Sequence, residues 1–204
     1  MTAATAPTIG VDFGTTNTVV SMTHGDDHAR LVRFAIDNRE LFAFRSALSS
    51  HAVQGRPGEA AERVVEAGPW AIEAYLEDPL ETRFIQSFKT FAASAAFTET
   101  RILDKRNQFE DLLAAFLLRL RDHAGAQLAA LPSRIVVGRP VTFAGSSPNE
   151  ALALTRYEEA FRRLGFSDIR YAYEPVGAAF FFARQLKQDA TVLVADFGGG
   201  TSDF

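Results

Sequence analysis

The 204-residue sequence predicts an α/β fold in which helices flank a mixed β-sheet, with an inserted α+β subdomain. Two observations support this prediction. Three apolar strand patterns joined by short turns open the chain, and strand patterns alternate with helical patterns in its second half. Strands joined by tight turns pair antiparallel, whereas strand–helix–strand units place their strands parallel. A meander followed by such units therefore gives a mixed sheet.

The meander is predicted by the first 36 residues. The β-branched and apolar run TIGVDF (8–13) indicates a buried strand, and TVVSM (18–22) resumes as a second strand after GTTN. The turn cluster HGDD then precedes the alternating ARLVRFAI (29–36), a third strand. From residue 40 to 108, segments rich in Gly and Pro mix with short helical pieces such as WAIEAYL (70–76), which indicates an inserted subdomain.

The second half alternates helices and strands. Apolar residues at helical spacing predict a helix over 109–131, and RIVVG (134–138) has the continuous apolar pattern of a parallel strand. A capping box with Ser147 as N-cap opens a second helix that ends at Gly165. DIRYAY (168–173) is the next strand.

The last part of the chain repeats the alternation once more. Pro175 opens a further helix, and TVLVADF (191–197) reads as the last strand. The aromatic run Phe180–Phe182 points to three sides of this helix, which predicts deep burial.

The composition excludes several classes of function. With 21 basic and 25 acidic residues the net charge is −4, which gives no support for a nucleic-acid or membrane-binding surface. The absence of cysteine excludes disulfides, zinc–thiolate sites, iron–sulfur clusters and a cysteine nucleophile. The opening MTAATAPT lacks the features of a signal peptide, and no apolar stretch is long enough to span a bilayer. We expect a soluble, cytoplasmic protein.

Two segments share one design that suits phosphate binding. GVDFGTTNT (10–18) and VADFGGGTSDF (194–204) both run from an apolar strand through Asp-Phe-Gly into a small, hydroxyl-rich turn. Successive backbone N–H groups in such turns form an anion-binding concavity. Because an aspartate at the mouth of each turn would repel bare phosphate, the pair favours a Mg²⁺ ion as well. Either turn alone fits an ordinary hairpin, but two matched copies favour opposed phosphate loops.

The two loops resemble the phosphate-1 and phosphate-2 motifs of the actin, sugar-kinase and heat-shock-chaperone ATPase superfamily, and most of all those of the DnaK-type chaperones. YEPVGAA (173–179) resembles the connect-1 segment, and FIQSFKTF (84–91) lies where these chaperones place a catalytic lysine. YLEDPLETRFIQSFKTF (75–91) and VVGRPVTF (136–143) are closer to the short YegD-like branch.

The resemblance implies a fold and a domain organisation. The fold would be the ribonuclease H-like mixed five-stranded sheet of an actin-like ATPase lobe I. Residues 1–39 and 109–204 would form its subdomain IA, and residues 40–108 an inserted subdomain IB. The chain would then be the N-terminal lobe of a longer ATPase, without the second lobe that holds the adenosine. We therefore expect the isolated lobe to bind nucleotide poorly and to hydrolyse it negligibly.

The resemblance also implies roles for individual residues, with ATP or ADP and Mg²⁺ as cofactors. Asp12 and Asp196 would hold Mg²⁺ through water, Lys89 would lie near the γ-phosphate, and Glu174 and Asp203 would polarise water or hold the outer shell of the metal. The residues that would wrap the phosphates are Gly14, Thr15, Thr16, Asn17, Gly198, Gly199, Gly200 and Thr201. From the residues alone, Lys89 also fits a solvated lysine and Glu174 a helix N-terminus.

The implied function is that of the nucleotide-binding lobe of a DnaK-like or YegD-like molecular chaperone that hydrolyses ATP in its full-length form. Its partners would be nucleotide, the second lobe and, in addition, client proteins or a co-chaperone, with no nucleic acid and no membrane. A small-molecule kinase would need a carboxylate base after RIVVG, where the chain reads Gly-Arg-Pro-Val (138–141). A filament-forming, MreB-like protein would have a smaller insertion and no counterpart of Lys89. A nucleotide-dependent scaffold without turnover remains an alternative.

Overall fold

The computed structural model describes residues 5–25, 28–54, 61–200 and 202–203, and its largest sheet has the order β13-β12-β1-β2-β3. These strands are β1 (Thr5–Phe13), β2 (Asn17–Gly25), β3 (Ala29–Leu31), β12 (Arg134–Arg139) and β13 (Asp168–Tyr173). A sixth short strand, β6 (Ala43–Arg45), pairs with the start of β2. β1 pairs antiparallel with β2, whereas β12 runs parallel to both β1 and β13. The mixed character of the sheet is therefore confirmed.

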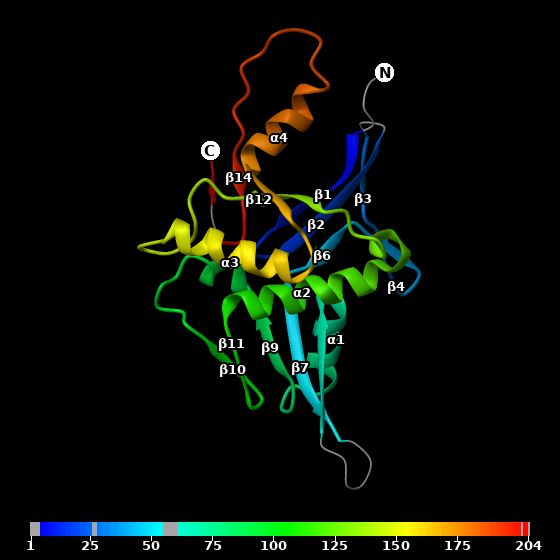
Figure 1. Ribbon diagram of the computed structural model, residues 1–204, viewed down its shortest axis with the longest axis vertical. Helices are drawn as coiled ribbons and strands as arrows, with labels where there is room; N and C mark the ends of the chain where they lie inside the picture. The colour runs from blue at the N-terminus through cyan, green and yellow to red at the C-terminus, as the bar shows by residue number, and fades with distance from the viewer. Residues whose placement is uncertain (1–4, 26–27, 55–60, 201, 204) are drawn as a thin grey trace.

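Two helices cover one face of this sheet. α2 (Phe109–Ala124) and α3 (Glu150–Arg163) pack against each other, and Figure 1 shows them crossing the middle of the molecule. α2 ends seven residues earlier than the pattern predicts, because Gly125 adopts a φ of 57° and the chain continues as the 3₁₀ helix η2 (Gly125–Leu128). The N-cap of α3 is Asn149, whose side chain accepts the N–H of Leu152 at 3.0 Å, rather than Ser147.

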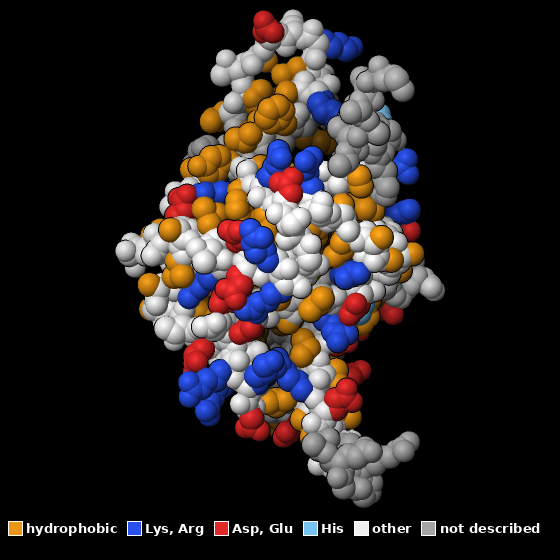
Figure 2. Space-filling view, viewed as in Figure 1, with side chains coloured by type: hydrophobic (Ala, Val, Ile, Leu, Met, Phe, Trp, Pro, Cys, Tyr) orange, Lys and Arg blue, Asp and Glu red, His pale blue; other side chains and the backbone are white. Residues whose placement is uncertain are grey.

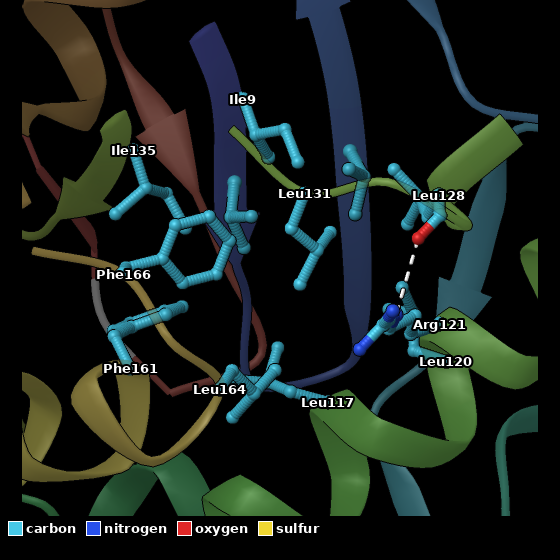
Figure 3. Close-up of a pocket in the computed structure, with 12 residues that line it drawn as sticks. Ile9, Leu117, Leu120, Arg121, Leu128, Leu131, Ile135, Phe161, Leu164 and Phe166 are labelled. Atoms are coloured by element: carbon cyan, nitrogen blue, oxygen red, sulfur yellow. Dashed lines mark hydrogen bonds between the residues drawn. The ribbon is translucent and has the colours of Figure 1, made fainter. Parts of the chain in front are cut away.

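The core lies between the sheet and these helices. Alternate residues of the central strands, such as Ile9, Val11 and Ile135, are buried against apolar side chains of α2 and α3. A cavity of about 20 Å³ remains among them, and Figure 3 shows its apolar lining with Arg121 at one side, donating to the carbonyl of Leu128. A space of this size and character holds at most one water and is no ligand site.

The described residues between 47 and 86 form a second, smaller sheet on the far side of α2. Its strands are β7 (Ala47–Val53), β8 (Glu62–Ala67) and β9 (Arg83–Gln86), all antiparallel, and α1 (Gly68–Glu77) packs against them. Two hairpins form separate two-stranded sheets: β4 (Phe34–Ile36) with β5 (Arg39–Leu41), and β10 (Thr100–Ile102) with β11 (Lys105–Asn107). The 3₁₀ helix η1 (Phe88–Phe91) follows β9 and returns the chain toward the main sheet.

The C-terminal part differs from the predictions in two respects. Of the strand expected over 191–197 only β14 (Asp196–Phe197) forms, and it pairs with β15 (Ser202–Asp203) instead of the main sheet. Helix α4 (Glu174–Ala183) forms as expected, but Phe180, Phe181 and Phe182 are 69%, 71% and 48% exposed, so their predicted burial is wrong.

The reason for this exposure is the position of α4. Figure 1 shows α4 extending away from the body of the molecule, and it packs mainly on β12 and β13. Figure 2 shows hydrophobic side chains gathered over this upper part. No helix among the described residues is long and apolar enough to cross a membrane.

Candidate functional site

The first glycine-rich loop is the tight turn between β1 and β2. The N–H of Gly14 donates to the carbonyl of Asn17 at 3.0 Å, which closes the turn. A Cβ at position 14 would collide with that same carbonyl oxygen, so only glycine allows this approach. The turn therefore sits at the end of the central strand, with Thr15 and Thr16 at its tip.

The second glycine-rich loop lies directly on the first. A Cβ added to Gly199 would collide with the hydroxyl oxygen of Thr16, and one added to Gly200 would lie 2.7 Å from that of Thr15. The glycines thus allow two segments that are about 180 residues apart to touch. Thr201 lies outside the described residues, and Asp203 is described only as part of the backbone of β15.

Lys89 and Glu174 form an ion pair beside these loops. The ammonium of Lys89, on η1, donates to the carboxylate of Glu174, the first residue of α4, at 2.8 Å. The two side chains are 7% and 11% exposed. Lys89 is therefore not a freely solvated lysine. Glu174 does begin a helix, but it also pairs with Lys89.

Aromatic packing fixes the backbone under this pair. Phe13 follows Asp12 and Phe88 precedes Lys89, and their rings lie 5.3 Å apart with no solvent exposure. Both rings also contact Phe116 of α2 at 5.7 Å between centroids. One buried cluster therefore sets the positions of Asp12 and Lys89 relative to each other.

The loops and the ion pair line one polar pocket of about 360 Å³. Its lining residues are Asp12, Gly14, Thr15, Thr16, Asn17, Lys89, Glu174, Asp196, Phe197, Gly198 and Gly199. The structure thus brings together most of the site residues predicted from the sequence. Phe197, the middle residue of the second Asp-Phe-Gly pattern, also lines the pocket and was not predicted as a site residue, although its place next to Asp196 was a signal.

The pocket carries an excess of negative charge. Three carboxylates face one ammonium, so two negative charges are left over among the described residues. Burial raises the pKa of the Asp12 carboxyl, Lys89 partly offsets this, and Asp196 raises the pKa further. Burial likewise raises the pKa of Glu174, Lys89 lowers it, and Asp12 and Asp196 raise it. A divalent cation placed between these carboxylates would relieve their repulsion.

Two carboxylates of the pocket could hold a Mg²⁺ ion together with water and phosphate oxygens. Among the described residues no group of three or more acidic or histidine side chains could hold a metal. Mg²⁺ characteristically keeps several waters and takes one or two carboxylates together with phosphate oxygens. Asp12 and Asp196, which face the pocket from the two loops, match that pattern.

The chain is similar to bacterial and algal chaperones. It is 28% identical to the chaperone protein DnaK of Mycoplasmopsis synoviae over 205 residues, 26% to a DnaK of Guillardia theta over 209, and 22% to an HscA homologue of Rickettsia africae over 195. Each match covers 96% of this chain but only 28% to 31% of the relative. No family model matches the sequence. The mixed sheet with its helices and this similarity together support a relationship to the Hsp70 family of chaperones.

Proposed function

We propose that this chain binds the phosphates of ATP or ADP together with Mg²⁺, as the nucleotide-binding lobe of a DnaK-like chaperone. One observation carries the proposal. Two glycine loops from opposite ends of the sequence touch each other around a pocket that holds a buried Lys–Glu pair and two further carboxylates. The turn preferences of two ordinary hairpins would not explain why both loops meet at these charged side chains.

Each group has a task that suits its chemistry. The backbone N–H groups and hydroxyls of the loops would bind phosphate oxygens, because such nests carry partial positive charge. Asp12 and Asp196 would hold Mg²⁺, which when bound neutralises phosphate charge and polarises the terminal phosphoryl group. The Lys89 ammonium would face the terminal phosphate, and Glu174 would orient a water molecule or the outer shell of the metal.

The activity of the whole protein extends this proposal. The chain spans about three tenths of the length of the curated chaperones that it matches. We propose that ATP hydrolysis needs a second wall across the pocket, and that the nucleotide state then acts on client proteins or a co-chaperone. Membership of the YegD-like branch, suggested by the segments 75–91 and 136–143, belongs to the same proposal.

A small-molecule kinase is the less favoured alternative. Its carboxylate base would lie at the end of β12, where the chain has Gly138, Arg139 and then Pro140. The guanidinium of Arg139 is buried and pairs with Glu150 at 2.6 Å, with its charge facing α3 instead of the pocket. No described residue at that position can accept a proton from a substrate hydroxyl.

Calorimetry of this chain tests the proposal. Since the described pocket is polar and offers little surface for a base, we expect Mg·ATP and inorganic Mg·triphosphate to bind with similar Kd values of about 1 mM. EDTA and Asp12→Asn should each abolish binding, because EDTA removes Mg²⁺ and the substitution removes one of the carboxylates that would hold it. Asp104→Asn, which changes an exposed aspartate in the β10–β11 turn, is the matched control. Unchanged binding in Asp12→Asn would refute the assignment of the pocket.

A further inference from the structure

Arg156 of α3 makes an unusual set of contacts outside the pocket. Its side chain is only 8% exposed, and its guanidinium donates to backbone carbonyls alone. Nη1 donates to Phe91, Ala92 and Ser94 at 3.0, 2.9 and 3.1 Å, and Nη2 donates to Phe97 at 2.5 Å. Among the described residues no carboxylate pairs with Arg156, so these carbonyl dipoles are what compensate its buried charge.

All four carbonyls belong to the segment that directly follows Lys89. The other side of Lys89 is also fixed, because Ser87 adopts a left-handed φ of 56° and its carbonyl accepts the hydroxyl and N–H of Thr90 at 2.8 and 3.1 Å. The N–H of Asn149, at the start of α3, donates to Ala93 at 2.9 Å. Helix α3 therefore holds the returning chain at several points.

The short helix that carries Lys89 depends on tertiary contacts for its position: Phe88 packs into the aromatic cluster before Lys89, and the bonds of Arg156 hold the chain after it. η1 has four residues, and a single 3₁₀ turn with i→i+3 bonds has little stability of its own. Lys89 adds a flexible side chain that loses rotamer freedom when its ammonium is fixed against Glu174. Tertiary contacts that fix the backbone next to Lys89 reduce the conformational entropy that is lost when its ammonium pairs with Glu174.

We propose that Arg156 is a positioning residue for Lys89. Its guanidinium fixes residues 91–97, and through them it fixes η1, so that the ammonium of Lys89 is held at Glu174 before any ligand arrives. The importance of Lys89 for phosphate binding rests on the proposed function. The positioning of Lys89 by Arg156 is a property of the ligand-free chain. Arg156 touches neither loop and has no contact with the pocket lining among its described hydrogen bonds.

The chain offers a direct readout because it has three lysines. Lys89 is buried and paired, whereas Lys105 and Lys187 are exposed and serve as internal references. Pulse acetylation followed by mass spectrometry gives the labelling rate of each lysine. In Arg156→Met we expect the relative rate of Lys89 to rise about tenfold, since local opening exposes the amine. Arg156→Lys should give a smaller rise, because an ammonium cannot span all four carbonyls.

Arg121→Met is the matched control. Arg121 also donates to two backbone carbonyls, those of Leu128 and Ala129 at 3.1 and 2.9 Å, but at the far end of α2. Its loss should leave the labelling of Lys89 within about twofold of wild type, as expected for local openings in separate regions. The proposal is refuted if Lys89 keeps its wild-type rate in folded Arg156→Met, or if Arg121→Met accelerates it equally. If Arg156→Met does not fold, Arg156→Lys decides by the same criterion.

The experiment contains no nucleotide or metal, so its outcome is independent of the proposed function. If Arg156 positions Lys89 but the chain does not bind Mg·triphosphate, Lys89 should be acetylated faster in Arg156→Met, while calorimetry of the wild type should show no heat of binding. If both proposals hold, Mg·triphosphate should restore the protection of Lys89 in Arg156→Met, at a higher ligand concentration than the wild type requires.

Discussion

Most phenylalanines in the body of this molecule are buried, with Phe42 and Phe91 the exposed ones among the described residues there, whereas those described in its C-terminal arm are exposed. In the body, residues 5–173, Phe13, Phe44 and Phe88 have no solvent exposure. In the C-terminal arm, residues 174–200, Phe180 and Phe181 are about 70% exposed, and Figure 1 shows the arm standing away from the body. Residues of one type therefore contribute to a packed core in one region and to an apolar surface in the other.

The candidate site is built from both regions. The body supplies Asp12, the first glycine loop and Lys89, all fixed by buried aromatic packing. The arm supplies Asp196 and the second glycine loop, which are exposed, and Glu174, which is 11% exposed and paired with Lys89. The first loop and the Lys89–Glu174 pair are therefore preorganised, whereas the second loop can move at little cost in packing.

The largest expected effect comes from comparing one substitution in the two regions. Phe88→Ala should lower the free energy of unfolding by about 3 to 5 kcal/mol, because it removes a ring from a close-packed core. Phe181→Ala should change it by less than about 0.5 kcal/mol, because that ring is already in solvent. Urea unfolding of both variants measures the difference. Equal losses would show that the arm is packed in solution.

The ion pair joins the two regions, so breaking it tests their connection. Lys89→Met leaves Glu174 without its cation and should cost about 2 to 3 kcal/mol at pH 7, somewhat less than a fully buried pair. The pKa of Glu174, already raised by burial, then rises further because the cation that lowers it is gone. A raised carboxyl pKa favours the folded state at low pH, so the cost should shrink as the pH falls from 7 toward 4.5.

Unfolding titrations at several pH values check this sign. The double variant Lys89→Met/Glu174→Gln, which removes both charges, should regain most of the lost stability at pH 7. A penalty in Lys89→Met that is independent of pH, or a double variant no more stable than the single one, would contradict the coupling.

The smallest effect is expected inside the body. Val20→Ile adds one methylene next to the apolar cavity of about 20 Å³ and should raise the free energy of unfolding by up to about 1 kcal/mol. Thermal unfolding measures the change. A lower melting temperature would mean that the added methylene cannot enter the cavity without strain.

Strands, helix ends and glycine loops could be predicted from the sequence, because local residue patterns determine them. The apolar, β-branched runs 8–13 and 134–138 predicted central strands, and Gly165 at φ 97° ends α3 as expected. The matched composition of the two glycine loops predicted their shared site, because glycine and hydroxyl side chains have a specific use at phosphates. The resemblance to chaperones singled out Lys89, whose own neighbours carry no signal of a site.

Other features depend on contacts that no local pattern encodes. The carbonyls bound by Arg156 lie 59 to 65 residues away in sequence, and backbone acceptors leave no trace in residue type. The aromatic run of α4 indicated burial, but apolar character does not specify what would cover it. The strand pattern of 191–197 needed a neighbouring strand, and among the described residues only β15 pairs with its last two positions.

Backbone amide NMR of the chain during titration with Mg·ATP tests the central claim most directly. The structure offers two hollows near α4, namely the polar pocket between the loops and a more open groove of about 480 Å³ between α4 and the uncovered face of the sheet. If the loops bind phosphate, we expect Mg²⁺-dependent shifts at Gly14, Thr15 and Gly199, and the same pattern with inorganic Mg·triphosphate. Shifts centred on the groove, around Ser21 and Phe181, with the loop amides unmoved would contradict it.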